Sequence, residues 1–205
     1  MHFEKVSFDR FVTDIHELYG ENTLLEKDIR IMYDTIQIPK RSTVGSAGYD
    51  FVIPYSIYVF KNSSIVIPTG IRAVNMPDNV VLLIAPRSGL GFKYRVSLAN
   101  TIGVIDSDYA GSSNEGHILI KICYDDFNST SKINDSYLIT NNDKDPTLPV
   151  ITSKSIINSN DDTSIFIQAG DRFCQGIFTF CLFTSDDDES LCKTRDGGFG
   201  STSNI

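Results

Sequence analysis

Carboxylates at two places in the chain have the right setting for hydrolytic chemistry. Asp50 ends Gly45–Phe51, a run of small residues that permits a tight turn. The alternation of apolar and polar residues in Asn100–Gly111 predicts a hairpin whose tip presents Asp106, Asp108 and Tyr109. Asp106 and Asp108 lie two residues apart, and on an extended strand they would share a face. A carboxylate can act as a general base or hold a hard cation. Taken alone, Asp50 fits a turn-capping side chain better than a metal ligand.

Donors for an anion follow the most apolar run of the sequence. In Ala85–Gly91, Arg87 offers a charged fork of donors, Ser88 offers a hydroxyl, and Gly89 leaves its amide accessible. The segment lacks the lysine and the spacing of a Walker loop. Because proline and glycine also simply make turns, the segment alone leaves a phosphate cradle and a plain turn both open.

Two further polar segments interrupt the apolar runs of the sequence. Ala169–Ile177 begins with a turn, contains Gln175 and continues into a strong strand. Arg195–Ser203 combines an arginine, an aromatic ring, glycines and hydroxyls at the C-terminal end. That composition fits a flap that closes over an anionic aromatic ligand, and it fits a disordered tail as well.

The elements that must position these residues are mostly short strands. Apolar residues at three- and four-residue spacing predict an amphipathic helix over residues 8–19, with Ser7 as a cap and Gly20 as a stop. From about Ile29 onward, short apolar or alternating runs separated by Pro and Gly predict an all-β barrel or sandwich. The expected strands are 31–38, 56–60, 64–67, 80–85, 95–99, 118–124, 164–167 and 176–183.

Residues 125–163 are polar and rich in Asn, Asp and Ser, which indicates an insertion too short to bury a core of its own. Within it, 136–140 and 149–153 fit a hairpin. The chain is thus divided into an N-terminal helical extension (1–28), a β domain (29–194) and a C-terminal segment (195–205).

Composition excludes several classes of function. The 205 residues carry a formal net charge of −8, so we expect neither nucleic acid nor an anionic membrane as a partner, and a polyanion must be met locally. No apolar run approaches the length of a membrane span, and the expected compartment is the cytoplasm. The four cysteines form no C-x-x-C pair and the three histidines have no ligand spacing, so we expect buried reduced thiols and no zinc site.

In their order and spacing, the five segments resemble the five motifs of the trimeric dUTPase family, over about residues 45–203. The resemblance implies a jelly-roll β-barrel (a β-clip), assembled as a homotrimer whose active sites are shared between subunits. It also implies hydrolysis of dUTP to dUMP and pyrophosphate with Mg²⁺, which limits uracil incorporation into DNA.

The resemblance also implies a role for each residue. Asp106 corresponds to the carboxylate that activates water, Asp50 to the one that holds Mg²⁺ through water, and Tyr109 to the ring against the deoxyribose. Uracil recognition falls to Asn100 and the backbone of Gly103, Val104 and Ile105, while Phe199 is expected to stack on the base. The phosphate contacts fall to Arg87, Ser88, Gly89, Gln175, Arg195, Gly200, Ser201 and Thr202.

Several features depart from the family pattern. The N-terminal helix lies outside the usual core, and its apolar face is a candidate partner site if it does not fold back. Ser112–Gly116 lengthens the third motif, and Ser203 replaces a common glycine. Two alternatives stay open, namely a dCTP deaminase of the same fold and a dUTPase scaffold that also binds a regulatory protein through the insertion.

Overall fold

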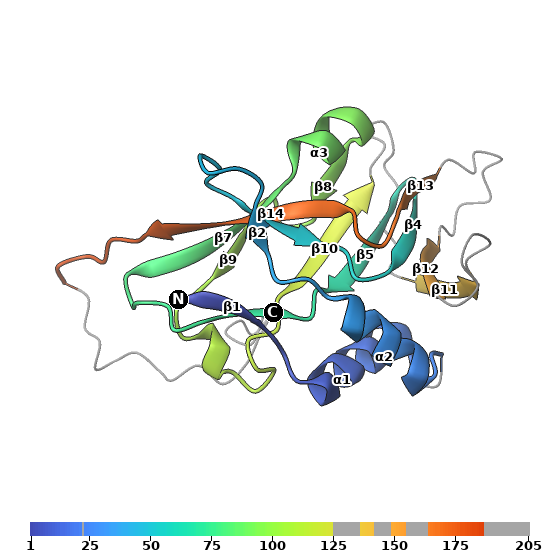
Figure 1. Cartoon of the computed structure of the whole chain (residues 1–205). Helices are drawn as coiled ribbons and strands as arrows, with labels where there is room; N and C mark the ends of the chain where they lie inside the picture. Colours follow the sequence, from blue (N-terminus) through green and yellow to red (C-terminus); the bar gives the residue numbers. More distant parts are fainter. Residues whose placement is uncertain (22, 125–135, 142–148, 155–163, 187–205) are drawn as a thin grey trace.

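The structure is a computed structural model of the whole chain, and it describes residues 1–21, 23–124, 136–141, 149–154 and 164–186 (Figure 1). As expected, strands dominate. The described strands are β1 (His2–Lys5), β2 (Lys40–Arg41), β3 (Tyr49–Val52), β4 (Ser56–Phe60), β5 (Ser63–Pro68), β6 (Ile71–Val74), β7 (Val80–Pro86), β8 (Val96–Leu98), β9 (Gly103–Ile105), β10 (Leu119–Tyr124), β11 (Ser136–Asn141), β12 (Pro149–Lys154), β13 (Ser164–Ile167) and β14 (Arg172–Phe180).

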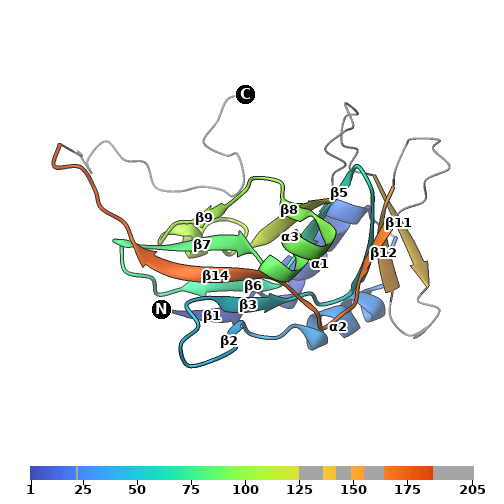
Figure 2. The ribbon, with the colours of Figure 1, turned by 90° about the horizontal axis from the view of Figure 1, so that it is seen from above.

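The largest sheet positions most of the candidate residues. Its strands run in the order β2-β3-β14-β7-β9, and they lie side by side in Figure 2. The central strand β14 is antiparallel to both neighbours, with Gln175 opposite Asp50 on β3 and opposite Ala85 on β7. Leu82 and Ile84 of β7 turn into the core, which holds this sheet in register.

A second group of strands covers the other side of the core. β10 pairs with β5 and β8, and β4 pairs with β12 and β13. The hairpin expected within the insertion is confirmed, because β11 and β12 pair over six residues. β12 then adds to β4 in parallel, so this part of the insertion extends a sheet of the domain.

The expected N-terminal helix is confirmed as α1 (Phe8–Tyr19). The Ser7 hydroxyl accepts a hydrogen bond from the Arg10 amide (3.1 Å), and Gly20 ends the helix at φ 97°. Phe11 and Ile15 are fully buried. The apolar face of α1 is therefore folded back on the domain, and the alternative of an uncovered partner site on that face is wrong.

The strand expected over residues 31–38 is also wrong, because α2 (Glu26–Thr35) occupies most of it. Ile29, Met32 and Ile36 are all buried, and they follow one another at three- and four-residue spacing. That spacing is helical, whereas the neighbouring β-branched residues suggested a strand. Tertiary packing against α1 and the core decides in favour of the helix.

The N-terminal residues share one hydrophobic core with the strands. β1 pairs with β6, and Phe3 packs edge-on against Phe51. Cys123 and Cys174 are buried and Cys181 is partly buried, all as free thiols, in agreement with expectation; Cys192 lies outside the described residues. Among the described residues, no helix is long and apolar enough to cross a bilayer.

Candidate active site

Strand register brings three of the five segments to one end of the large sheet. Asp50 on β3 lies opposite Gln175 on β14, and Cys174 lies opposite Pro86 at the end of β7. Arg87 follows Pro86 directly. Asp50, Arg87 and Gln175, which are far apart in the sequence, therefore meet at the same edge.

Asp50 is nearly buried and lies between two arginines. Its carboxylate is 3.3 Å from Arg87 Nε and 3.2 Å from Arg172 Nη1, and the Ser42 hydroxyl donates to it as well. The Asp50 side chain is 10% exposed, whereas Arg87 and Arg172 are 37% and 49% exposed. The carboxylate thus fixes two guanidinium groups whose remaining donors face solvent, an arrangement suited to an anion.

The segment after β7 begins a short helix, which corrects the expectation of an open glycine-rich loop. α3 (Ser88–Tyr94) starts immediately after Arg87, and the amides of Leu90 and Gly91 donate to the Arg87 carbonyl. Ser88 and Gly89 form the exposed first turn. Arg87, Ser88 and Gly91 border a hollow of about 280 Å³.

Gln175 packs closely against the first segment. A Cβ added at Gly48 would lie 2.4 Å from Gln175 Oε1, so a larger residue at this position would displace the end of the Gln175 side chain. The Gln175 amide donates weakly to the Pro86 carbonyl at 3.5 Å. Gln175 is therefore held between the first and second segments, next to Asp50.

The third segment differs from the expected hairpin with an acidic tip. β8 pairs with β10, β9 pairs with β7, and the chain turns between them at Thr101, with φ 63°. Asp106 follows β9 and is exposed, but Tyr109 is 4% exposed in a 3-10 turn, η1 (Tyr109–Gly111). The predicted hairpin is wrong, because Asp106 and the residues after it form a turn and η1 instead of a second strand.

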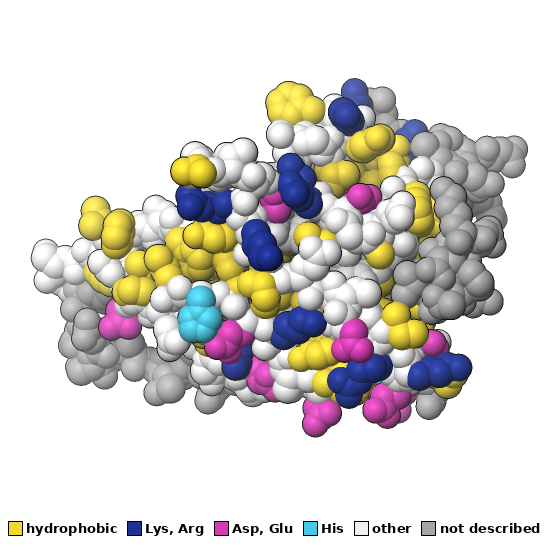
Figure 3. All heavy atoms as spheres, viewed as in Figure 1, with side chains coloured by type: hydrophobic (Ala, Val, Ile, Leu, Met, Phe, Trp, Pro, Cys, Tyr) yellow, Lys and Arg dark blue, Asp and Glu magenta, His cyan; other side chains and the backbone are white. Residues whose placement is uncertain are grey.

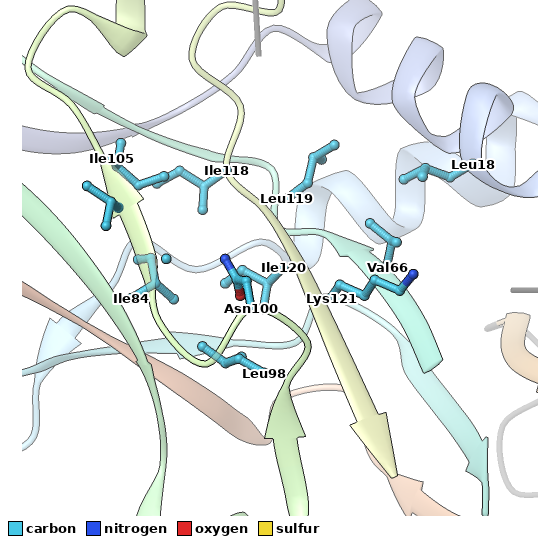
Figure 4. Close-up of a pocket in the computed structure, with 12 residues that line it drawn as sticks. Leu18, Val66, Ile84, Leu98, Asn100, Ile105, Ile118, Leu119, Ile120 and Lys121 are labelled. Carbon is cyan, nitrogen blue, oxygen red and sulfur yellow. The ribbon is translucent and has the colours of Figure 1, made fainter. Parts of the chain in front are cut away.

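A cavity of about 350 Å³ lies along this segment (Figure 4). Asn100 and the backbone of Gly103–Ile105 line it, together with apolar side chains of β8 and β10. The volume lies within the range of small-molecule pockets, about 300–1,000 Å³. Apart from Asn100 and Lys121, the side chains that line the cavity are apolar, and such a lining suits a flat ring with a few polar groups.

The two groups of candidate residues lie toward opposite ends of β7. Ile105, just before Asp106, is opposite Leu82, whereas Arg87 follows the far end of the strand. Five residues of extended chain separate Leu82 from Arg87, roughly 17 Å. Within one chain, the structure therefore does not bring Asp106 to the Asp50–Arg87 group.

The remaining predicted residues, Arg195, Phe199, Gly200, Ser201 and Thr202, lie outside the described residues. Sequence reasoning missed two contacts of Asp50, from Ser42 and Arg172. Arg172 lies at the turn that begins Ala169–Ile177, and a turn by itself indicates no role for its side chain. The available signal was its position three residues before Gln175, at the start of the same strand.

Basic side chains lie near the residues that are expected to contact phosphate, although the chain has a net charge of −8. In Figure 3, Lys and Arg side chains lie over β2 and beside α3. A polyanion bound at this end of the sheet would meet these positive charges.

Comparisons with known proteins identify the family. A family model described as dUTPase matches residues 34–122. A deoxyuridine 5'-triphosphate nucleotidohydrolase of Lactococcus lactis is 30% identical over 168 residues, which cover 82% of this chain and 88% of that protein. One of Haemophilus ducreyi is 40% identical over 90 residues, which cover 41% of this chain and 59% of that protein.

Solved structures show the same fold. The dUTPase of Streptococcus mutans has a TM-score of 0.54 and 24% identity, covering 90% of this chain and 99% of that one. A dUTPase of phage phi11 of S. aureus has a TM-score of 0.51 and 20% identity, covering 78% and 93%. The jelly-roll fold expected from the sequence is confirmed at this level. With the Lactococcus relative matched over most of its length, the chain belongs to the dUTPase family.

Proposed function

We propose that this protein hydrolyses dUTP to dUMP and pyrophosphate. The observation that carries the proposal is the match to a deoxyuridine 5'-triphosphate nucleotidohydrolase over 88% of that protein's length. The Asp50–Arg87–Arg172 group and the separate cavity beside Gly103–Ile105 support it, because the substrate needs both a polyanion site and a site for a small polar ring.

Substrate recognition follows from these two regions. In the cavity, Asn100 and the strand backbone offer donors and acceptors fixed by β9 and its partner β7. Fixed groups can reject cytosine, because the wrong ring edge would leave a buried polar group unpaired. At the other region, Arg87, the Ser88–Gly89 turn and Gln175 are assigned to the phosphates.

Asp106 is the proposed general base. It accepts a proton from water while the water oxygen bonds to the α-phosphorus and the bond to the bridging oxygen breaks, so pyrophosphate leaves. Asp106 is exposed in one chain, so water and a bound substrate can reach its carboxylate. The C-terminal residues Arg195 to Thr202, with Phe199 against the base, are proposed to close over the substrate.

Asp50 suits Mg²⁺ only in the presence of the triphosphate. Carboxylate oxygen is a preferred ligand for this cation, but both Asp50 oxygens already contact guanidinium groups. Phosphate oxygens that draw Arg87 and Arg172 toward themselves would free the carboxylate to accept bonds from metal-bound water. A bound Mg²⁺ would neutralise part of the negative charge of the phosphates.

A homotrimer with shared sites fits the separation along β7. Since roughly 17 Å of strand lies between the Asp106 end and Arg87 in one chain, a compact site for one nucleotide requires Asp106 from a second subunit. Cyclic symmetry would then generate three equivalent sites, each containing one copy of every group.

The proposal is tested by pyrophosphate release from each deoxynucleoside triphosphate and from UTP, with Mg²⁺ and with a chelator. We expect rapid release from dUTP alone, and only with the metal. Ammonia is measured in the dCTP reaction, because its release would favour a deaminase. An assembled protein that leaves dUTP intact in the presence of Mg²⁺ contradicts the proposal.

A further inference from the structure

The segment Ser112–His117 connects α1 to Tyr109. The Tyr109 hydroxyl donates to the His117 carbonyl (3.0 Å) and accepts from the Asn114 side-chain amide (2.9 Å). Ser112 and Gly116 bond to Asn114 Oδ1 in turn, at 2.6 and 3.1 Å. The position of the Tyr109 ring is therefore fixed by this segment.

Close packing leaves the segment little freedom. Gly116 has φ 71°, and a Cβ there would lie 2.6 Å from Ala110 Cα, directly beside Tyr109. Glu115 also adopts a positive φ, 59°, which costs free energy for a residue with a side chain. Such a conformation persists only where surrounding contacts impose it, and this suggests a functional reason.

Those contacts come from the N-terminal residues. Ser7 donates to both Glu115 oxygens, from its amide (2.8 Å) and from its hydroxyl (2.6 Å). Despite partial burial, these bonds and the nearby Arg72 and Arg10 hold the pKa of Glu115 below its usual value. Glu115 is thus anchored as a carboxylate at the start of α1.

A second anchor joins the middle of α1 to His117, which is completely buried. His117 Nε2 accepts from the Gly70 amide (2.7 Å), so the ring proton lies on Nδ1, where it faces Asp14. Asp14 is held in place by Arg10, one turn earlier on α1, through Nε at 3.0 Å. The chain of contacts runs from α1 through Asp14 and His117 to the hydroxyl of Tyr109.

We propose that Ser7 and Asp14 are positioning residues that make α1 part of the sugar-discriminating apparatus by holding Tyr109 in place. The inference rests on the proposed function, in which the Tyr109 ring leaves no room for a 2′-hydroxyl. Because a ring that shifts slightly admits ribose, loosening either anchor relaxes the preference for dUTP over UTP.

The test compares the ratio of kcat/KM for dUTP to that for UTP in Asp14→Ala, Asp14→Asn and Ser7→Ala proteins. Asp14→Ala is expected to lower the ratio about tenfold, mainly through a smaller KM for UTP. Asp14→Asn is expected to keep most of the ratio of the unaltered protein, because the amide oxygen still accepts a hydrogen bond from His117 Nδ1. Glu17→Gln is the matched control, since Glu17 is exposed on the same helix and contacts Arg10 at 3.5 Å.

Tyr109→Phe distinguishes positioning from general loosening. If Asp14 acts through the Tyr109 hydroxyl, the double variant loses no more discrimination than Tyr109→Phe alone. Binding of dUMP and UMP, measured by calorimetry, provides the same ratio without turnover. If the Asp14→Ala protein does not fold, the ratio of kcat/KM for dUTP to that for UTP in the Ser7→Ala protein tests the inference alone.

Equal losses for dUTP and UTP in the Asp14 and Ser7 variants would overturn the inference and leave α1 a purely structural element. That outcome differs from a failure of the proposed function, in which the unaltered protein itself hydrolyses no dUTP.

Discussion

At the scale of single residues, the proposed chemistry depends on the different settings of Asp50 and Asp106. Asp50 is nearly buried and contacts two arginines, so it is suited to hold these two cationic groups in place. Asp106 is exposed at the end of β9, where a substrate and a second chain can reach it. Position, and not residue type, separates the two roles.

Asp106→Asn is expected to lower kcat by about 10²–10⁴, the range for loss of a general base. Binding of a non-hydrolysable dUTP analogue should stay within a few-fold, because the amide has the same shape. Stopped-flow turnover and calorimetry give the two quantities. Asp108→Asn is the control, and a turnover equal to that of the unaltered protein in Asp106→Asn would refute the base assignment.

Mg²⁺ binding is expected to depend on the nucleotide. The free protein should bind the cation weakly, because Arg87 and Arg172 repel it from Asp50, and a non-hydrolysable dUTP analogue should tighten binding at least tenfold. Calorimetric titration with and without the analogue measures the difference. Equal affinity in both titrations would show that the metal is held elsewhere.

At the scale of elements, the strands were largely predictable and the connections were not. β4 and β13 match their predicted bounds because short runs of β-branched residues lie between turn signals. α2 was missed because its two buried residues, Ile29 and Met32, lie among neighbours that also suit strands. The Asp50–Arg172 contact was missed because sequence carries no information on the register between β3 and β14.

The docking of α1 predicts a dependence of stability on acid. Burial opposes ionisation of Asp14, but His117 and Arg10 outweigh it, and the pKa of Asp14 falls below its ordinary value of 3.8. The ionised Asp14 carboxylate therefore stabilises the fold fully above about pH 4. This stabilisation is lost as the pH falls through the lowered pKa that Asp14 has in the folded protein.

Asp14→Asn should remove that acid-dependent step and lower the free energy of unfolding at pH 7 by roughly 1–3 kcal/mol. Urea denaturation between pH 2.5 and 7 measures both effects. Glu17→Gln, on the exposed side of α1, should keep the profile of the unaltered protein. A profile in Asp14→Asn that still declines equally at low pH would assign the titration to another group.

Removal of residues 195–205 is expected to reduce kcat/KM for dUTP by at least 10², since the proposed lid supplies Arg195 and Phe199. The melting temperature should change little, because the core lies in the β domain and α1–α2. Differential scanning calorimetry and turnover are measured together. Loss of the melting transition in the truncated protein would contradict the lid assignment.

At the scale of the whole molecule, β7 separates the two halves of the proposed site. Its far end carries Arg87 beside Asp50, and its other end approaches Asp106 through β9. A rigid strand in the middle of a sheet cannot fold to bring these ends together. We therefore propose that catalysis by this chain requires assembly, with the base of one subunit serving the phosphate site of another.

Subunit mixing tests this claim most directly. Asp106→Asn and Arg87→Ala proteins are each nearly inactive alone, and they are unfolded together, refolded as a mixture and assayed for pyrophosphate release from dUTP. With shared sites and random assembly, about a quarter of the sites receive an intact Asp106 from one chain and an intact Arg87 from another, so activity returns to about a quarter of that of the unaltered protein. A mixture that is no more active than the two parents would contradict the account.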